Sequence, residues 1–460
     1  MGSKIHLFFF PSRLFAKELI IFFIITLSLQ QIIRQTMPHD RNLRIHFGLK
    51  LPLLLSFLMS SIGIIKATND EWVAVWATAE QLVEPHNCPP APGLAGNTLR
   101  QIVQVSGGGE TVRLRLSGEF SDADTEMLSV TLAEASSGGS SADIDESTLV
   151  SLTFDGHTAV TIPAGGFVLS DPIQFPLRPR MDVAITICYG QTSATSITGH
   201  PGSRTTSYLA TGSTDDFADA VPTDHWYHIS AIHAVSGQSK RAIAVLGNSI
   251  TDGRGTTTNG QDRWTDQLSR RLLREADLRD FTVLNFGLGG NCVLQGGLGP
   301  TGQSRYQRDL FNQPGITHII LFEGVNDLGT TPPPSKDAPA PAVTTARRLI
   351  RVYQQIISEA HERGLKVGIA TITPIKHNRG YDSPDHEQGR QLFNAWVRTS
   401  HEADFIIDFE QAVCAPDDPF SLNPRFLFEN DYLHPNAAGY QRMADAIDLD
   451  IFRQDYTTNK

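Results

Sequence analysis

The chain has 460 residues, with 38 Lys and Arg against 49 Asp and Glu, and a formal net charge of −11 at pH 7. This length predicts two or three domains, and a charged fraction of 19%, below the usual level of about 25%, excludes a disordered chain or a coiled coil. The negative net charge argues against nucleic acid as a partner.

The amino-terminal segment is basic and apolar. Residues 1–66 carry eight Lys and Arg against two Asp and Glu, with apolar runs at 19–29 and 51–65. Both runs are shorter than the roughly 18–20 residues that span a bilayer, and the second has the layout of a secretory signal peptide. We interpret residues 1–67 as a targeting segment, with translation starting at Met37, and expect a secreted or periplasmic protein. The alternative is an uncleaved membrane anchor, which would be its only contact with a membrane.

Residues 70–236 read as an all-β domain. Short runs of strand-forming residues alternate with turn residues, and residues 111–117 alternate apolar and polar side chains with a period of two. The expected strands are 100–106, 111–117, 128–132, 149–154, 158–162, 172–175 and 181–188. Since no helix interrupts this pattern, we expect an antiparallel sandwich resembling a jelly roll.

Four aromatic residues of this region have two interpretations. They are Trp72, Trp76, Trp226 and Tyr227. They either form a platform on which sugar rings stack, or belong to the core and the domain interface. The β domain is therefore either a glycan-binding element or a wall of the active-site cleft.

The cysteines show no metal-binding pattern. Cys88, Cys188, Cys292 and Cys414 are far apart, without a C-x-x-C pair or a neighbouring His at ligand spacing. The spacing argues against a structural zinc site. In an exported protein, a disulfide and isolated buried thiols both remain open.

Residues 240–455 change to an α/β pattern. Continuous apolar strands, expected at 241–246, 281–286, 318–322, 365–371 and 405–408, alternate with helices expected at 264–274, 344–363, 387–400 and 436–451. Strands that are apolar on both faces and alternate with helices predict a parallel sheet with helices on its faces.

The polar motifs of this half follow its strands. Open α/β sheets bind ligands beyond the carboxyl ends of their strands. Three strands run into motifs there, and a fourth motif precedes the last helix: 247–253, 287–291, 323–327 and 431–435. We therefore expect all four motifs to meet at one edge of the sheet.

These motifs contain the groups of a hydrolytic triad. Ser249 offers a hydroxyl, His434 an imidazole that takes its proton, and Asp431 a carboxylate that orients the ring. The backbone N–H groups of Ser249 and Gly290 and the side-chain amide of Asn326 are the expected oxyanion-hole donors. Two further Asp residues are expected to support the site: Asp327 supports the Asn326 loop, and Asp252 holds the turn around Ser249. His377 and His386 are expected to be surface or rim groups.

Two other readings of the glycine-rich turns fail. A dinucleotide-binding G-x-G-x-x-G motif starting at Gly287 would place its third glycine at Cys292. The segment Gly247-x-Ser249-x-Thr251 lacks the second glycine of the G-x-S-x-G nucleophile elbow. A Rossmann-type dehydrogenase and an ordinary α/β-hydrolase are therefore disfavoured.

The four motifs together resemble the SGNH/GDSL hydrolase superfamily, with Ser249, Gly290, Asn326 and His434 on its four named positions. Asn248 departs from the founding pattern, which has Asp before the serine. The preceding β region resembles a secreted subgroup related to bacterial xylan esterases and lipase-like acylhydrolases. The resemblance implies a flavodoxin-like three-layer fold, no metal or other cofactor, and ester hydrolysis through an acyl-enzyme.

These observations predict a two-domain serine esterase that removes short acyl groups, chiefly acetyl, from a polysaccharide or oligosaccharide. The choice of substrate rests on analogy. One alternative is a lipase-like or phospholipase-like acylhydrolase. Another is a glycan-binding surface protein with a vestigial hydrolase domain.

Overall fold

The computed structural model describes residues 72–235, the β half, and residues 237–453, the α/β half. Both halves belong to one unit of the chain, residues 70–460. The expected targeting segment 1–67, with its start at Met37 and its signal peptide, lies outside the described residues. In the part of the chain that the structure describes, no helix is both long enough and apolar enough to cross a membrane.

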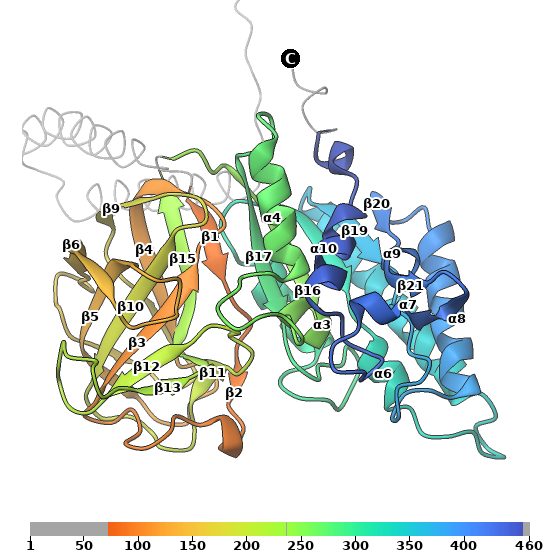
Figure 1. Ribbon diagram of the computed structural model, residues 1–460, viewed down its shortest axis with the longest axis horizontal. Helices are drawn as coiled ribbons and strands as arrows, with labels where there is room; N and C mark the ends of the chain where they lie inside the picture. Colours follow the sequence, from red (N-terminus) through yellow and green to blue (C-terminus); the bar gives the residue numbers. More distant parts are fainter. Residues whose placement is uncertain (1–71, 236, 454–460) are drawn as a thin grey trace, which may run out of the picture. The chain divides into compact units, whose positions relative to one another are not determined.

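Two antiparallel sheets form most of the β half (Figure 1). The first contains β1 (Val73–Ala77), β15 (Ile229–Val235), β4 (Gly109–Ser117), β8 (Phe167–Leu169) and β9 (Ile173–Leu177). The second contains β13 (Val221–Thr223), β12 (Ser207–Ala210), β3 (Thr98–Gln104), β10 (Asp182–Tyr189), β5 (Thr125–Ala135), β6 (Ile144–Ser151) and β7 (Val160–Ile162). A small third sheet contains β14 (Trp226–Tyr227), β11 (Thr198–His200) and β2 (Gln81–Leu82).

The two large sheets share one apolar core. The alternation predicted for β4 is confirmed, because Val112, Leu114 and Leu116 are fully buried while the residues between them are partly exposed. These side chains pack with inward-facing residues of β3 and β10. The described residues of this half contain no α-helix, only a 3₁₀ turn at Pro85–Asn87, so the predicted β-rich region is confirmed. Its assignment as a jelly-roll-like sandwich stays a prediction.

A five-stranded parallel sheet forms the centre of the α/β half. Its order is β17 (Phe281–Gly287), β16 (Arg241–Gly247), β18 (Ile316–Phe322), β19 (Lys366–Ala370) and β20 (Phe405–Ile407). Each strand overlaps its predicted range. β16, the first of these strands along the chain, lies in the sheet between β17, the second, and β18, the third. The order in which strands are added to the sheet therefore switches sides at β16, and doubly wound sheets bind their ligands at such a switch point.

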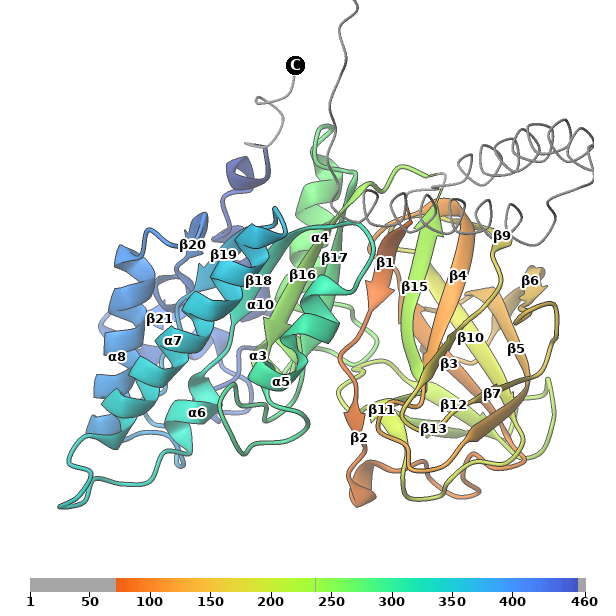
Figure 2. The ribbon, with the colours of Figure 1, turned by 180° about the vertical axis from the view of Figure 1, so that it is seen from behind.

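The main helices are α4 (Trp264–Arg274), α7 (Pro341–Glu362), α8 (Pro384–Thr399) and α10 (Ala437–Asp445). Helices α4 and α10 lie in front of the sheet in Figure 1, and α7 lies in front of it in the reverse view of Figure 2. The predicted helix 436–451 is wrong in its last turns. It ends at Asp445, and a separate 3₁₀ turn, Leu449–Phe452, begins where the Asp448 side chain accepts a hydrogen bond from the N–H of Asp450.

Strand β1 joins the two halves. It pairs with β15 on one side, and on the other it packs beside β17, the edge strand of the parallel sheet. Thr282 Oγ1 donates to the Ala74 carbonyl over 2.8 Å, and the N–H of Val283 donates to Ser106 Oγ over 3.0 Å. All five residues of β1 are buried, and several alanines of the β half enter the core of the α/β half: Ala74, Ala77, Ala79 and Ala231. The halves are therefore packed through a shared core.

Candidate active site

Three loops meet because three neighbouring strands end at the same level. In the parallel register, Gly247 at the end of β16 lies opposite Gly287 of β17 and Phe322 of β18. The segments that follow carry Ser249, Gly290 and Asn326. The expected convergence of the strand-end motifs is therefore present in the structure.

Ser249 begins a single-turn helix, α3 (Ser249–Asp252). The side chain of Asn248 caps the helix by accepting the N–H of Ile250 over 3.0 Å, and Gly253 ends it in the left-handed conformation with φ 100°. The helix lies directly against β17, where a Cβ on Gly287 would lie 2.2 Å from the backbone nitrogen of Asp252. Glycine at position 287 thus allows Ser249 to sit at the sheet edge.

The structure brings Ser249, His434 and Asp431 together. Ser249 Oγ lies 2.8 Å from His434 Nε2, and His434 Nδ1 lies 2.6 Å from Asp431 Oδ2. Because an ionised carboxylate only accepts hydrogen bonds, Nδ1 carries the ring proton and Nε2 is left to accept the proton of the Ser249 hydroxyl. This geometry is that of a nucleophile, a general base and an orienting acid.

Asp431 is held by the loop that it belongs to. Its Oδ1 accepts the backbone N–H groups of Leu433 over 2.8 Å and His434 over 2.9 Å, and its carbonyl accepts Asn378 Nδ2 over 2.8 Å. Burial favours a higher pKa for Asp431, but the hydrogen bonds from the His434 ring and backbone outweigh it and lower the pKa. The carboxylate is therefore ionised and faces the ring in a fixed direction.

Asn326 presents an amide of fixed orientation. Its Nδ2 donates to the Asn291 carbonyl over 2.7 Å, and its Oδ1 accepts the Tyr381 hydroxyl over 2.8 Å. These two bonds determine which end of the amide is the nitrogen, and the second N–H of Nδ2 remains available to an oxyanion. Sequence reasoning missed Tyr381, which lies 55 residues further along the chain and outside the four motifs.

Gly290 adopts φ 66°, in the left-handed region that favours glycine. Its carbonyl accepts the N–H of Leu298 over 3.0 Å, and a Cβ at Gly290 would lie 3.0 Å from the Leu298 side chain. The bond from Asn326 to Asn291 ties this loop to the third strand end. Among the described residues, the backbone N–H of Gly290 has no hydrogen-bond acceptor, so it is free to serve as a donor.

A buried polar network lies behind the serine. Asn248 Nδ2 donates to Glu323 Oε2 over 3.1 Å, and the fully buried Arg305 lies 3.5 Å from Glu323 Oε1. Arg305 also donates to the carbonyls of Gly247 over 2.9 Å and Phe286 over 2.7 Å, which ties β16 to β17. An amide at position 248 both caps α3 and donates to Glu323, whereas a carboxylate could only accept.

The Glu323 carboxyl gives a pH-dependent stability prediction. Burial, partly offset by Arg305, raises its pKa from 4.5 to about 8. Between these two values the folded protein retains a proton that the unfolded chain has lost, so stability falls as pH rises. We therefore take the free energy of unfolding of the wild type minus that of Glu323→Gln. This difference should fall by up to about 1.4 kcal/mol for each unit of pH increase in this window. Urea unfolding of both proteins between pH 5 and 8 measures it, and a constant difference would contradict it.

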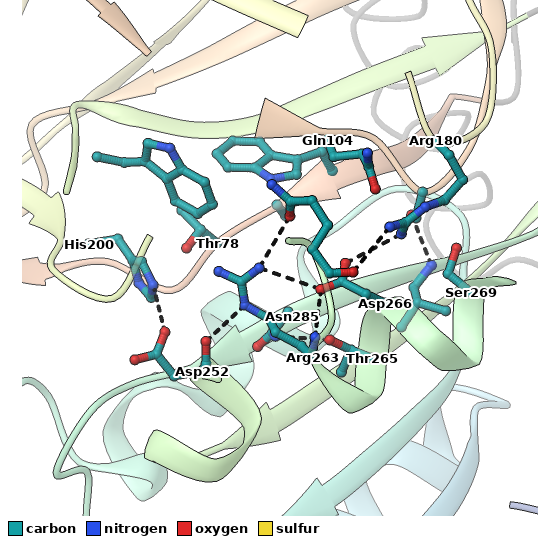
Figure 3. Close-up of a pocket in the computed structure, with 16 residues that line it drawn as sticks. Thr78, Gln104, Arg180, His200, Asp252, Arg263, Thr265, Asp266, Ser269 and Asn285 are labelled. Atoms are coloured by element: carbon teal, nitrogen blue, oxygen red, sulfur yellow. Dashed lines mark hydrogen bonds and ion pairs between the residues drawn. The ribbon is translucent and has the colours of Figure 1, made fainter. Parts of the chain in front are cut away.

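The β half contacts the nucleophile helix directly. His200 Nε2 lies 3.0 Å from Asp252 Oδ1, and Arg204 Nη2 donates to Asp252 Oδ2 over 3.1 Å. Figure 3 shows the His200 contact and, further along the same interface, the pair of Arg180 with Asp266. The expectation that Asp252 serves the turn around Ser249 thus gains named partners that sequence reasoning had missed.

Two cavities lie between the halves. The smaller one, drawn in Figure 3, has a volume of 40 Å³, and Ser249 is not among the lining residues of either cavity. The larger one, of 230 Å³, is lined by the loop that precedes Gly290 and by polar residues of the β half. Its lining includes Gln81, Glu84, Asn87, Arg204, Leu288 and Gly289. This second cavity adjoins the candidate oxyanion loop.

Asp327 and His377 lie as expected, and His386 does not. Asp327 accepts the N–H groups of Val293 and Leu294, both over 2.8 Å, which is the expected supporting role. His377 is exposed, as expected. His386 is not a surface or rim group. It is buried, and its ring nitrogens contact the carbonyls of Tyr381 and Thr331, both over 3.0 Å.

The structure also decides between the two interpretations of the aromatic residues. Trp76, Trp226 and Tyr227 are at most 7% exposed, and the rings of Trp76 and Trp226 pack edge to face. Since buried rings cannot stack on a sugar from solution, the core interpretation holds for these three. The cysteine alternatives are resolved as well, because Cys88, Cys188, Cys292 and Cys414 are all unpaired thiols.

Comparisons with known proteins agree with the family resemblance. Residues 245–442 match the GDSL-like lipase/acylhydrolase family. No curated protein matches the chain. Matching solved structures include a family two carbohydrate esterase from Cellvibrio japonicus, with 12% identity, 84% of this chain and 96% of that chain covered, and a TM-score of 0.35.

Two further structures match the chain over a smaller part. A carbohydrate acetylesterase from Sinorhizobium meliloti shares 15% identity, covers 47% of this chain and 100% of its own, and has a TM-score of 0.34. A GDSL-like lipase from Bacteroides thetaiotaomicron shares 19% identity, covers 47% of this chain and 89% of its own, and has a TM-score of 0.33. The family match shows that residues 245–442 are a GDSL-like lipase/acylhydrolase domain, and the chain is a carboxylic ester hydrolase.

Proposed function

We propose that the chain is an exported serine esterase that removes short acyl groups, chiefly acetyl, from carbohydrate through an acyl-enzyme on Ser249. The observation that supports it most is the pair of hydrogen bonds that joins Ser249 Oγ, the His434 ring and the Asp431 carboxylate. We further propose a flavodoxin-like three-layer arrangement for the α/β half and a jelly-roll-like sandwich for the β half.

The chemistry follows from the order of these groups. Ser249 Oγ attacks the ester carbonyl carbon while its proton passes to His434 Nε2, and Asp431 stabilises the resulting imidazolium. The oxyanion accepts hydrogen bonds from the Ser249 and Gly290 N–H groups and from Asn326 Nδ2. His434 then gives the proton to the leaving alcohol oxygen, which leaves the acyl group on Ser249. A water molecule, deprotonated by His434, attacks the acyl-enzyme carbonyl carbon, and His434 returns the proton to Ser249 Oγ as the bond to the acyl group breaks and the acid is released.

The cavity beside Gly289 is small and adjoins the candidate oxyanion loop. Its 230 Å³ lies below the roughly 300–1,000 Å³ of sites for drug-sized ligands. Glu84 and Asn87 line it from the β half, and Arg254 and Gly289 line it from the α/β half. Carboxylate, amide and guanidinium groups suit the hydroxyls of a sugar better than a long acyl chain, which gains affinity from apolar contact.

Acyl-chain selectivity tests this proposal. The kcat/KM for p-nitrophenyl acetate should exceed that for the octanoate by at least about tenfold, since a cavity of 230 Å³ leaves little room for the longer chain. Acetate release from acetylated xylan, measured by mass spectrometry, then tests the carbohydrate part, with chemically deacetylated xylan as the control. A preference for octanoate would instead identify a lipase-like acylhydrolase. Binding to xylan without any ester hydrolysis would identify a vestigial domain.

Export is tested separately. The proposal expects the mature protein outside the cytoplasm and without residues 1–67. Amino-terminal sequencing of the protein recovered from its native source measures this. A mature chain that begins at or before Met37 would contradict cleavage of the segment.

A further inference from the structure

We propose that Arg204 and His200 of the β half are positioning residues for the nucleophile, acting through Asp252. This inference rests on the proposed role of Ser249. It gives the β half a part in the chemical step in addition to lining a cavity.

The contacts converge on one buried carboxylate. Asp252 is the last residue of α3, three positions after Ser249, and is 2% exposed. His200 and Arg204 each bind one of its two oxygens, at 3.0 and 3.1 Å. Between them, Gly202 comes so close that a Cβ there would lie 2.0 Å from Asp252 Oδ2. The β half therefore encloses the end of the nucleophile helix.

A second cation ties the same segment to the helix. Arg263 Nε donates to the Asp252 carbonyl over 2.8 Å, and its Nη2 donates to the carbonyl of Ser203 in the β half. Figure 3 shows Arg263 between Asp252 and the residues around Asp266. The backbone and the side chain of Asp252 are thus both held by groups at this interface.

The charges support a fixed, ionised Asp252. Burial favours a higher pKa, but the positive charges of Arg204 and His200 outweigh it and lower the pKa of the carboxyl. The other ring nitrogen of His200 lies 2.8 Å from the Ala79 carbonyl, so the ring is held between the β half and Asp252. Arg204 and His200 of the β half therefore occupy both oxygens of the Asp252 carboxylate.

A helix of one turn depends on such contacts for its position. A single hydrogen-bonded turn is unstable by itself, because few hydrogen bonds offset the ordering of its backbone. Asn248 fixes the first end of α3 through Glu323, and Asp252 fixes the last. Ser249 lies between these two attachments. Loss of the second should let Ser249 Oγ and its N–H move relative to His434 and the oxyanion, and a shift of about 1 Å can cost about 10²-fold in rate.

The interface contains a matched control. Arg180 of the β half pairs with Asp266 of α4 at 3.3 Å, and their side chains are 16% and 15% exposed. This pair joins the same two halves and has similar chemistry, but it contacts α4 and not α3. Loss of Arg180 should weaken the interface without displacing Ser249.

The experiment compares Arg204→Ala with Arg180→Ala in the full chain. We expect Arg204→Ala to lower kcat for p-nitrophenyl acetate by about 10- to 100-fold with KM changed less than about threefold. Arg180→Ala should keep kcat within about twofold of the wild type. The thermal midpoint of both variants shows whether they lose stability to a similar extent.

Chemical rescue separates positioning from general stability. The Arg204 side chain is 27% exposed and lines the 230 Å³ cavity, so guanidinium from solution can reach the vacated place beside Asp252. Guanidinium chloride well below denaturing concentrations should raise the kcat of Arg204→Ala at least about fivefold and leave the kcat of Arg180→Ala unchanged. If Arg204→Ala does not fold, Arg204→Lys, which retains the charge, replaces it and should show a smaller fall in kcat.

A folded Arg204→Ala or Arg204→Lys variant with wild-type kcat would overturn the inference, and so would an equal fall in kcat in Arg180→Ala. The proposed function fails on a different result, which is retention of turnover by Ser249→Ala. An inactive Ser249→Ala together with a fully active Arg204→Ala would leave the esterase mechanism intact and remove only the role of the β half.

Discussion

Replacing Ser249 with alanine is expected to lower kcat for p-nitrophenyl acetate by about 10⁴- to 10⁶-fold. The substitution removes the only atom of the site that can form the acyl-enzyme. The oxyanion donors and the binding cavity remain, so a small residual rate above that of water is expected. The variant should still fold, because alanine is a good helix former at the first position of α3 and the hydroxyl has one side-chain partner, His434.

Ser269→Ala is the matched control for this variant. Ser269 is 1% exposed on α4, and its hydroxyl has no hydrogen-bond partner among the described residues. Its removal should leave kcat unchanged. Covalent labelling with a fluorophosphonate, followed by peptide mass spectrometry, should place the adduct on Ser249 in the wild type. Normal turnover in Ser249→Ala, or an adduct on another residue, would contradict the nucleophile assignment.

Asn326→Ala is expected to lower kcat by about 10²- to 10³-fold, with KM changed far less, because the amide donates most strongly to the charge that develops in the transition state. The substitution also breaks the bonds to the Asn291 carbonyl and the Tyr381 hydroxyl, so some loss of stability accompanies it. Steady-state kinetics together with a urea unfolding curve separate the two effects.

Asn394→Ala controls for the loss of a buried amide. Asn394 is fully buried on α8, where Nδ2 donates to the Ile372 carbonyl over 2.8 Å and to Glu410 Oε2 over 3.0 Å. It should lower stability by an amount similar to that of Asn326→Ala and leave kcat close to the wild-type value. Equal falls in kcat for both asparagine variants would show that Asn326 acts through the fold and not as an oxyanion donor.

The α/β half was predictable because its signals are local. The segment 241–246 is continuously apolar after Arg241, and the buried parallel strand Arg241–Gly247 has the same start. The chemical motifs follow those strands directly, so the sheet order places them together. Two residues between Asp431 and His434 are enough for the carboxylate to reach the ring. In each case the relevant contacts lie within a few residues or follow from strand order.

The residues that sequence reasoning missed are defined by contacts between distant parts of the chain. Tyr381 reaches Asn326, and Arg204 reaches Asp252, 48 residues further on. Tyr, Arg and His in loops have no periodic pattern, and their partners depend on how the two halves pack. The choice between the two interpretations of the aromatic residues stayed open for a related reason. Composition cannot show that Trp76 and Trp226 pack against each other.

The packing of the β half on β17 bears on how the hydrolase region can be produced by itself. A recombinant fragment beginning at Lys240 would leave the edge strand β17 without this cover, with the N–H of Val283 no longer bound by Ser106. Bare edges of this kind are templates for intermolecular pairing and aggregation. We therefore expect this fragment to be less soluble than residues 70–460. A cut at the family boundary, residue 245, would also divide the central strand Arg241–Gly247.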